Sequence, residues 1–248
     1  MIILKSQREI ARMKNACRIV AEVLDGLRCM VRPGITTIEL DNYASKRALR
    51  QKAKCAFRGY HNYPYSLCCS PNNQVVHGLP SSAPLQSGDI LSLDFGVVFD
   101  DFFGDAAITV PVGQISSEAE RLIAATEESL FAAIDMVRVE NRLGDVSFAV
   151  QKFVEDRGFS VVRDFVGHGI GKNLHEDPQI PNYGMAGKGI KLKSGMVLAI
   201  EPMINENGHE VVVLEDNWTV VTADGGLSAH FEHTVAVTDN GPEILTRL

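Results

Sequence analysis

Four acidic residues and one histidine lie beside short apolar runs and could together hold metal ions. Asp94 and Glu201 each close an apolar run that reads as a strand, and Asp105 and Glu232 each open one. A carboxylate beside a buried strand is costly unless it is paired, protonated or bound to a metal. Four carboxylates in one pocket could not all stay ionised without cations, and two divalent ions would balance their formal charge. Glycine-flanked His168 is the leading nitrogen ligand.

Three more histidines occupy positions that suggest a role. His77 and His175 lie in short motifs, and a neutral imidazole there can donate a hydrogen bond to a developing oxyanion. The alternative for both is a loop histidine hydrogen-bonded to backbone. His233 adjoins a candidate ligand, but strand alternation favours the opposite face of the sheet. His61 and His209 are expected at the surface.

The elements that would position these residues occur twice along the chain. Capping boxes at residues 6–9 and 117–120 open amphipathic helices, and second helices follow at about 36–52 and 143–157. The strand pattern at residues 87–94 matches that at 194–201, each ending in an acid. These matches keep one order at a nearly constant offset. They favour a duplicated α+β unit, whereas chance similarity between amphipathic helices would not explain the paired acids. A lone acid of this kind is more often a turn residue.

Composition narrows the class of protein. The 248 residues are 45% apolar and 22% charged, which is ordinary globular usage and excludes disordered, collagen-like and coiled-coil chains. The net charge of −7 argues against nucleic-acid binding. Five cysteines without a C-x-x-C pattern indicate reduced thiols in a cytoplasmic protein. The chain opens with only four apolar residues, so neither a signal peptide nor a membrane span is expected.

Other catalytic patterns fit poorly. The sequence has no G-x-S-x-G elbow, no Walker A motif and no G-x-G-x-x-G fingerprint. Cys68 lies near His77 in sequence, but nothing around it resembles a catalytic cysteine setting.

Nine motifs resemble those of the type I methionine aminopeptidases, in the short bacterial form of the M24 "pita-bread" metallopeptidases. The resemblance runs from Lys5 to about Leu245. The motifs are GYHNYP (59–64), VHGLP (76–80), LSLD (91–94), GD (104–105), GHGIG (167–171), LHEDP (174–178), IEPM (200–203), NWT (217–219) and FEHT (231–234). The resemblance implies one catalytic domain, residues 1–248, with pseudo-two-fold-related halves of about 1–115 and 116–248. An antiparallel sheet would surround a central dinuclear metal site.

The resemblance also implies a role for each candidate ligand. Asp94 would chelate one metal and His168 would bind the other, with Asp105 and Glu232 bridging the two. Glu201 would bind the metal held by His168 and act as general base. The two ions would be Co, Mn, Fe or Zn. A hydroxide between them would attack the first peptide bond of nascent proteins and release methionine, with a small second residue preferred.

Substrate contacts are implied in the same way. His77 would contact the scissile amide, and His175 would stabilise the carbonyl oxygen. The methionine pocket would be built from Phe57, Tyr60, Tyr63, Cys68, His77, Leu174, His175, Met203 and Trp218. A monovalent cation, Na or K, is implied near Asn72, Gln74 and Ser228. The partners would be nascent polypeptide N-termini and the ribosome, and the chain would be a monomer.

Four residues depart from the family pattern. Phe57 stands where a small residue or cysteine is expected, and Leu174 where phenylalanine is frequent, so the pair reads as an exchange of volume. His230 stands where glutamine is common, which predicts an added polar group near the pocket rim. Ala107 replaces a frequent hydroxyl, which predicts looser support around the ligands.

Two alternative functions remain open beside that of a methionine aminopeptidase: an Xaa-Pro-specific pita-bread peptidase and a non-catalytic peptide-binding module.

Overall fold

Four α-helices form where the sequence predicts them. The computed structural model describes residues 1–248. The helices are α1 (Gln7–Met30), α2 (Thr37–Arg50), α3 (Ser117–Asp135) and α4 (Leu143–Glu155). The predicted capping box is present at α1, where the Ser6 side chain accepts from the Glu9 backbone N–H and the Glu9 side chain accepts from the Ser6 backbone N–H. Thr36 and Glu39 form a second capping box at the start of α2, which was not among the predicted ones. None of the helices has the length and hydropathy to cross a lipid bilayer.

The predicted capping box at the start of α3 is wrong by one residue. Ser116 is the N-cap, and its Oγ accepts a hydrogen bond from the Ala119 backbone N–H at 3.2 Å. Ser116 keeps an extended backbone, whereas Ser117 is already helical. The helix therefore begins with a single serine cap and two acids in its first turn, which suits the positive end of the helix dipole.

One nine-stranded sheet runs through both halves of the chain. Its order is β1-β4-β5-β14-β9-β7-β8, with β2 on β4 and β15 on β14. Every described pairing is antiparallel. Its strands are β1 (Lys54–Cys55), β2 (Cys68–Pro71), β4 (Ile90–Phe99), β5 (Phe102–Pro111), β7 (Gly167–Gly169), β8 (Glu176–Ile180), β9 (Val197–Ile200), β14 (Glu232–Thr238) and β15 (Gly241–Ile244).

Two three-stranded sheets and a short 3-10 helix complete the fold. One sheet joins β6 (Ser160–Val161), β10 (Met203–Asn205) and β13 (Ser228–His230). The other joins β3 (Gln74–Val76), β11 (Val211–Val213) and β12 (Val220–Thr222). The 3-10 helix η1 (Tyr60–Asn62) lies between β1 and β2 in sequence.

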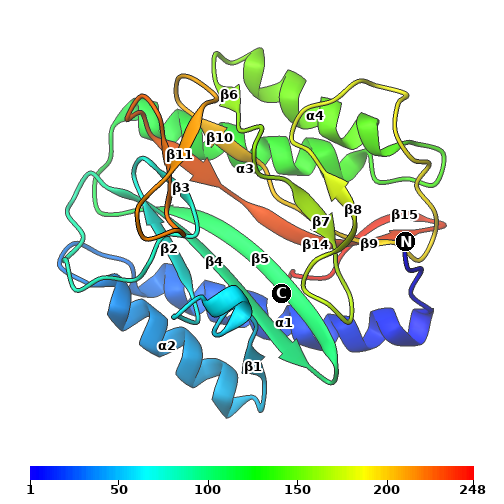
Figure 1. Cartoon of the computed structure of the whole chain (residues 1–248), viewed down its shortest axis with the longest axis horizontal. Helices are drawn as coiled ribbons and strands as arrows, with labels where there is room; N and C mark the ends of the chain where they lie inside the picture. The colour runs from blue at the N-terminus through cyan, green and yellow to red at the C-terminus, as the bar shows by residue number, and fades with distance from the viewer.

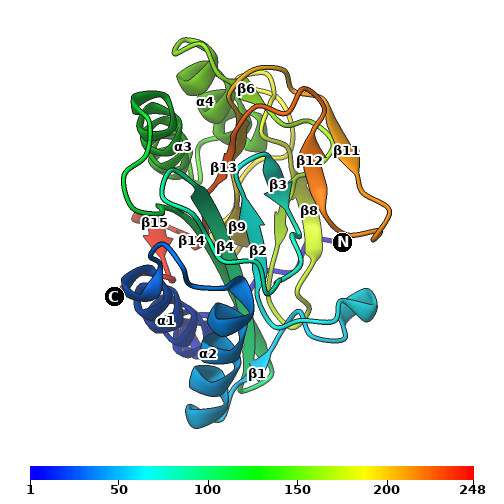
Figure 2. The same ribbon diagram turned by 90° about the vertical axis from the view of Figure 1, so that its left-hand side faces the viewer.

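The helices and the smaller strands lie on opposite sides of the main sheet. In Figure 1, α1 and α2 run along the bottom of the view and α3 and α4 along the top, with the long strands between them. The side view places α1 and α3 to one side of β4, and β3, β11 and β12 to the other (Figure 2). This is the predicted α+β architecture with an antiparallel sheet.

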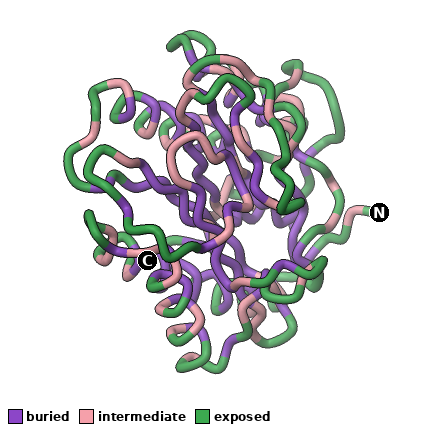
Figure 3. Tube along the Cα trace, turned by 60° about the vertical axis from the view of Figure 1, so that its left-hand side comes forward, coloured by how far each residue is buried: buried purple, intermediate pink, exposed green.

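The core lies between the helices and the main sheet. Buried residues concentrate along the central strands, and exposed residues along the outer helix faces and loops (Figure 3). β4 and β5 pair over their whole length, from Ile90 opposite Pro111 to Phe99 opposite Phe102. The first half of the sheet joins the second where β5 pairs with β14. That central seam carries acidic residues.

Candidate metal centre and substrate pocket

Five neighbouring strands of the main sheet each contribute one candidate ligand. Asp94 lies on β4, Asp105 on β5, Glu232 on β14 and His168 on β7, and Glu201 directly follows β9. These strands are consecutive in the order β4-β5-β14-β9-β7. Residues as far apart in sequence as Asp94 and Glu232, which are separated by 138 positions, are thereby brought onto neighbouring strands.

The strand register sets the ligands at similar levels. Ala107 on β5 is the register partner of Asp94 on one side and of Glu232 on the other. Asp105 shares the face of Ala107, because alternate residues of a strand point the same way. Ligand atoms of Asp105, His168 and Glu232 all lie within 4.8 Å of one another. Since Ala107 has only a methyl group, no hydroxyl supports the carboxylates from this position.

The sequence suggested that all four acids lie at strand ends, and for two of them this is wrong. Asp94 is the fifth residue of β4 and Asp105 the fourth of β5, and both strands are ten residues long. The apolar run before Asp94 continues as Phe95 and Val97 on its far side, so pairing with β5 does not stop at the charge. Glu201 and Glu232 do lie at strand ends.

Burial makes ionisation of the acids costly. It raises the pKa of Glu201 to about 8, and together with the Glu201 charge it raises that of Asp94 to about 7. Burial and neighbouring carboxylates also hold the pKa of Asp105 and Glu232 well above the ordinary range. Burial, followed by the nearby His175, lowers the pKa of His168 to about 3, which leaves a neutral imidazole.

The residues present fit a divalent metal site. Asp94 Oδ1, Asp105 Oδ1 and Glu232 Oε1 are buried without a hydrogen-bond partner. His168 Nδ1 lies 2.9 Å from the Gly169 carbonyl, to which it donates, so the Nε2 lone pair is free for a metal. That Nε2 lies 3.6 Å from Glu201 Oε1. Buried carboxylate oxygens and one imidazole form a donor set that suits Mn, Fe, Co or Zn.

Glycine lets the strand of His168 approach its neighbour closely. A Cβ built at Gly167 would lie 2.5 Å from the Ala199 carbonyl oxygen on β9. Any side chain there would push β7 away from β9, and with it His168 away from Glu201. Gly167 is therefore needed for the close approach of β7 to β9.

The acids open into a cavity of about 360 Å³. All nine residues predicted for the methionine pocket line it: Phe57, Tyr60, Tyr63, Cys68, His77, Leu174, His175, Met203 and Trp218. The five candidate ligands line the same cavity. Its walls are therefore largely apolar and aromatic, and its floor carries the carboxylates.

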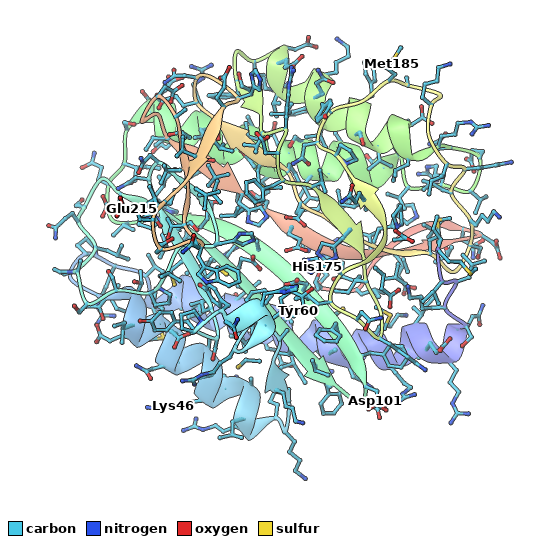
Figure 4. All side chains as sticks on the ribbon, viewed as in Figure 1. Lys46, Tyr60, Asp101, His175, Met185 and Glu215 are labelled. Carbon is cyan, nitrogen blue, oxygen red and sulfur yellow. The ribbon has the colours of Figure 1, made fainter.

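Two further histidines, His77 and His175, line this cavity. The His175 ring lies 4.3 Å from the His168 ring between centroids, and Tyr60 Oη lies 2.7 Å from His175 Nδ1. Figure 4 shows Tyr60 and His175 next to one another near the centre of the molecule. His77 has a φ of 59°, a left-handed conformation that is strained for a residue with a side chain. Burial lowers its pKa to about 4, so this imidazole is neutral as well.

Some lining residues were missed from the sequence. His61, expected only at the surface, is exposed but lines the cavity. Asp164, Phe165 and Val166 also line it, just before β7, and the His77 ring lies 5.7 Å from the Phe165 ring between centroids. The signal was available for His61, which lies inside the GYHNYP motif. Nothing in the sequence marked residues 164–166.

Three other histidines are placed by their contacts. His233 points away from the ligands, with Nδ1 2.9 Å from Thr246 Oγ1, as strand alternation predicted. His209 lies at the surface beside Glu210. His230 was expected near the pocket rim, and that prediction is wrong: it is 1% exposed, lies on β13 and is not among the residues that line the cavity.

The residues predicted for a monovalent cation lie near one another. The Ser228 backbone N–H donates to the Asn72 carbonyl at 2.9 Å, and Gln74 follows on β3. Asn72 has a φ of 56°, and Gln74 Oε1 is buried without a partner. The cation itself stays a prediction. All five cysteines are free thiols, as predicted.

Comparison with known proteins agrees with this geometry. Residues 11–239 match the model of metallopeptidase family M24. The chain is 56% identical to a methionine aminopeptidase of Clostridium perfringens over 246 residues, covering 99% of each. It is 49% identical to methionine aminopeptidase 1 of Bacillus subtilis, covering all of both chains. A methionine aminopeptidase structure from Thermotoga maritima has a TM-score of 0.98 at 47% identity over the full length of both.

More distant structures share the fold alone. The prolidase of Pyrococcus furiosus is 21% identical with a TM-score of 0.81, and the match covers 99% of this chain and 66% of that one. The cluster of candidate metal ligands, the full-length matches and the family model lead to one conclusion: the chain belongs to metallopeptidase family M24, among its methionine aminopeptidases.

Proposed function

We propose that the chain removes the N-terminal methionine from nascent polypeptides at the cage formed by Asp94, Asp105, His168, Glu201 and Glu232. Family membership makes it a metal-dependent hydrolase. The observation that carries the site assignment is that five adjacent strands direct five donors to the floor of one apolar cavity.

Two divalent ions, Co, Mn, Fe or Zn, fit the donor set. Asp94 would chelate one and His168 the other, with Asp105 and Glu232 bridging and Glu201 beside His168. When bound, such ions polarise a carbonyl and lower the pKa of water toward neutrality. Their positive charge also stabilises the ionised form of carboxyl groups that burial alone would keep protonated.

Three side chains of the protein then have separate roles in the reaction. Glu201 takes a proton from the attacking water, because its carboxylate lines the cavity in which the scissile bond would lie. His175 Nε2–H donates to the carbonyl oxygen as negative charge develops on it. His77, which also lines the cavity, contacts the amide nitrogen. The apolar walls exclude water and position the methionine side chain, whose thioether suits the aromatic lining.

The remaining parts of the proposal concern substrate and setting. A free α-amine near the carboxylates makes the activity exopeptidic, and a small second residue fits the tight space beyond the scissile bond. The proposed setting is the cytoplasm, where the five free thiols remain reduced. The proposal also includes one catalytic domain of two related halves, a monomeric state, docking to the ribosome and a bound monovalent cation.

The test uses Glu201→Gln and a substrate panel. We expect the reconstituted wild-type protein to release methionine from Met-Ala-Ser, and not to cleave Xaa-Pro peptides at a comparable rate. Glu201→Gln should lower turnover roughly 10²–10⁴-fold, the usual contribution of a general base. Wild-type turnover by Glu201→Gln with metal bound would contradict the base assignment. A preference for Xaa-Pro would contradict the substrate assignment, and binding of peptides without cleavage would indicate a non-catalytic module.

A further inference from the structure

His230 is a buried histidine whose Nε2 has no hydrogen-bond partner and lies near Glu201, one of the candidate metal ligands. It ends β13 and is the register partner of Met203, which lines the substrate cavity. The residue is 1% exposed, and its Nε2 has no partner. A buried nitrogen left unsatisfied in this way carries a free-energy cost, so a nearby acceptor is expected to use it.

The carboxylate of Glu201 is an acceptor within reach. His230 Nε2 lies 3.5 Å from Glu201 Oε2, and His168 Nε2 lies 3.6 Å from Oε1. The two carboxylate oxygens are therefore divided between two imidazoles. One oxygen faces the candidate ligand His168, and the other faces a residue outside the ligand set.

The backbone of His230 is held firmly enough to aim its ring. Thr109 Oγ1 donates to the His230 carbonyl at 2.8 Å and accepts from its backbone N–H at 2.9 Å. Ser92 Oγ lies 2.8 Å from the same hydroxyl and must donate to it, because the Thr109 proton is already used. These partners lie on β4 and β5, the strands that carry Asp94 and Asp105. The position of the His230 backbone is thus fixed by the same sheet that carries the candidate ligands.

We propose that His230 is a positioning residue, which donates its Nε2–H to Glu201 Oε2 and so holds Glu201 with Oε1 toward His168. This inference rests on the proposed role of Glu201. A carboxylate fixed in this way keeps a constant orientation between binding and proton transfer, whereas one held only on the side of His168 can rotate. Small losses of orientation at a reacting group are costly to the rate.

The test compares His230→Leu, which removes the donor, with His230→Gln, which keeps an N–H in reach. His233→Gln is the matched control, because His233 is a neighbouring histidine that faces away from the ligands. We expect His230→Leu to lower kcat for Met-Ala-Ser about tenfold with KM within about twofold, as for loss of one orienting hydrogen bond. His230→Gln should restore most of kcat, and His233→Gln should stay at the wild-type value.

A second readout does not depend on turnover. The visible absorption spectrum of the Co(II)-loaded protein reports on coordination, and we expect His230→Leu to shift it while His230→Gln and His233→Gln match the wild type. An unchanged Leu spectrum, or equal loss of kcat in Leu and Gln, would overturn the role of His230. If His230→Leu does not fold, His230→Asn, whose amide is too short to reach, replaces it. Failure of the wild-type protein to release methionine would count against the proposed function, while the spectra would still decide the role of His230.

Discussion

Tyr60 Oη lies 2.7 Å from Nδ1 of His175, and this contact joins η1 to the loop before β8. A hydroxyl that donates to Nδ1 leaves the proton on Nε2, the nitrogen that can face a substrate carbonyl. Burial, with a smaller effect of His61, lowers the pKa of His175, so the ring is neutral and its tautomer matters. Tyr60 therefore sets which end of His175 acts as donor.

Tyr60→Phe tests this relationship. Loss of one orienting hydrogen bond is expected to lower kcat for Met-Ala-Ser by about tenfold, while KM changes less. Tyr183→Phe is the control, because Tyr183 does not line the cavity. Steady-state kinetics of both variants decide the matter. Equal kcat in Tyr60→Phe and wild type would show that His175 keeps its tautomer without the hydroxyl.

The buried acids predict how pH affects metal binding. The pKa is raised from 3.8 to about 7 for Asp94 and from 4.5 to about 8 for Glu201. A raised folded-state pKa contributes stability below the ordinary value, and that contribution is lost as pH rises through the folded value. The metal-free protein should thus lose this stabilisation between about pH 4 and pH 8, the window set by the two acids.

Metal binding needs these acids deprotonated, so its stabilising effect should grow over the same range. His168, with its pKa lowered to about 3, is already neutral and adds little to this trend. For a domain of this size we expect the Mn-induced rise in Tm to increase by roughly 5–10 °C from about pH 5.5 to pH 8. Calorimetric scans with and without Mn measure it. A constant or shrinking rise would argue against buried carboxylates as the ligands.

A buried ion pair ties the start of the chain to the loop that carries His175. Lys5 Nζ lies 2.6 Å from Glu176 Oε2, and both side chains are 4% exposed. Glu176 Oε1 also accepts from the backbone N–H groups of Lys172 and Asn173, at 2.9 and 3.2 Å. The pair and these bonds together fix the residues on both sides of His175.

Lys5→Met should therefore lower the free energy of unfolding by roughly 3–5 kcal/mol, because it leaves a buried carboxylate without its cation. Lys46→Met, on the exposed face of α2 (Figure 4), should change it by less than ~0.5 kcal/mol. Urea unfolding of both variants gives the comparison. Restored stability in Lys5→Met combined with Glu176→Gln would support the pair, and identical midpoints for Lys5→Met and wild type would contradict it.

Phe57 should determine how tightly methionine is held. It is 8% exposed and lines the cavity, as does Leu174. The exchange of volume between these two residues stays a prediction. Phe57→Ala is expected to lower kcat/KM for Met-Ala-Ser roughly 10–100-fold through lost apolar and sulfur–aromatic contact. The control is Phe148→Ala, on the outer surface of α4. An unchanged kcat/KM would place the thioether elsewhere.

The sequence was most informative where local rules decide the structure. The capping residues Ser6 and Thr36 and the apolar spacing predicted the helices, because these signals act within one or two turns. The repeated strand pattern predicted that acids far apart in sequence would meet, because two similar α+β units related by a pseudo-two-fold axis bring equivalent residues together.

Other features depended on contacts that no local pattern reveals. Asp94 was assigned to a strand end because a buried charge inside a strand is unfavourable in isolation, and only pairing with β5 and the neighbouring ligands accounts for it. His230 was assigned to the rim, whereas its register with Met203 and its bonds to Thr109 bury it. His61 and Phe165 reach the cavity through the packing of loops.

The most direct test of the metal centre is diffraction from crystals of the Mn-loaded protein, with anomalous differences measured at the Mn absorption edge. The account predicts two peaks within bonding distance of Asp94, Asp105, His168, Glu201 and Glu232, with Asp105 and Glu232 between them. Peaks at any other place, or no peak among these five residues, would contradict it.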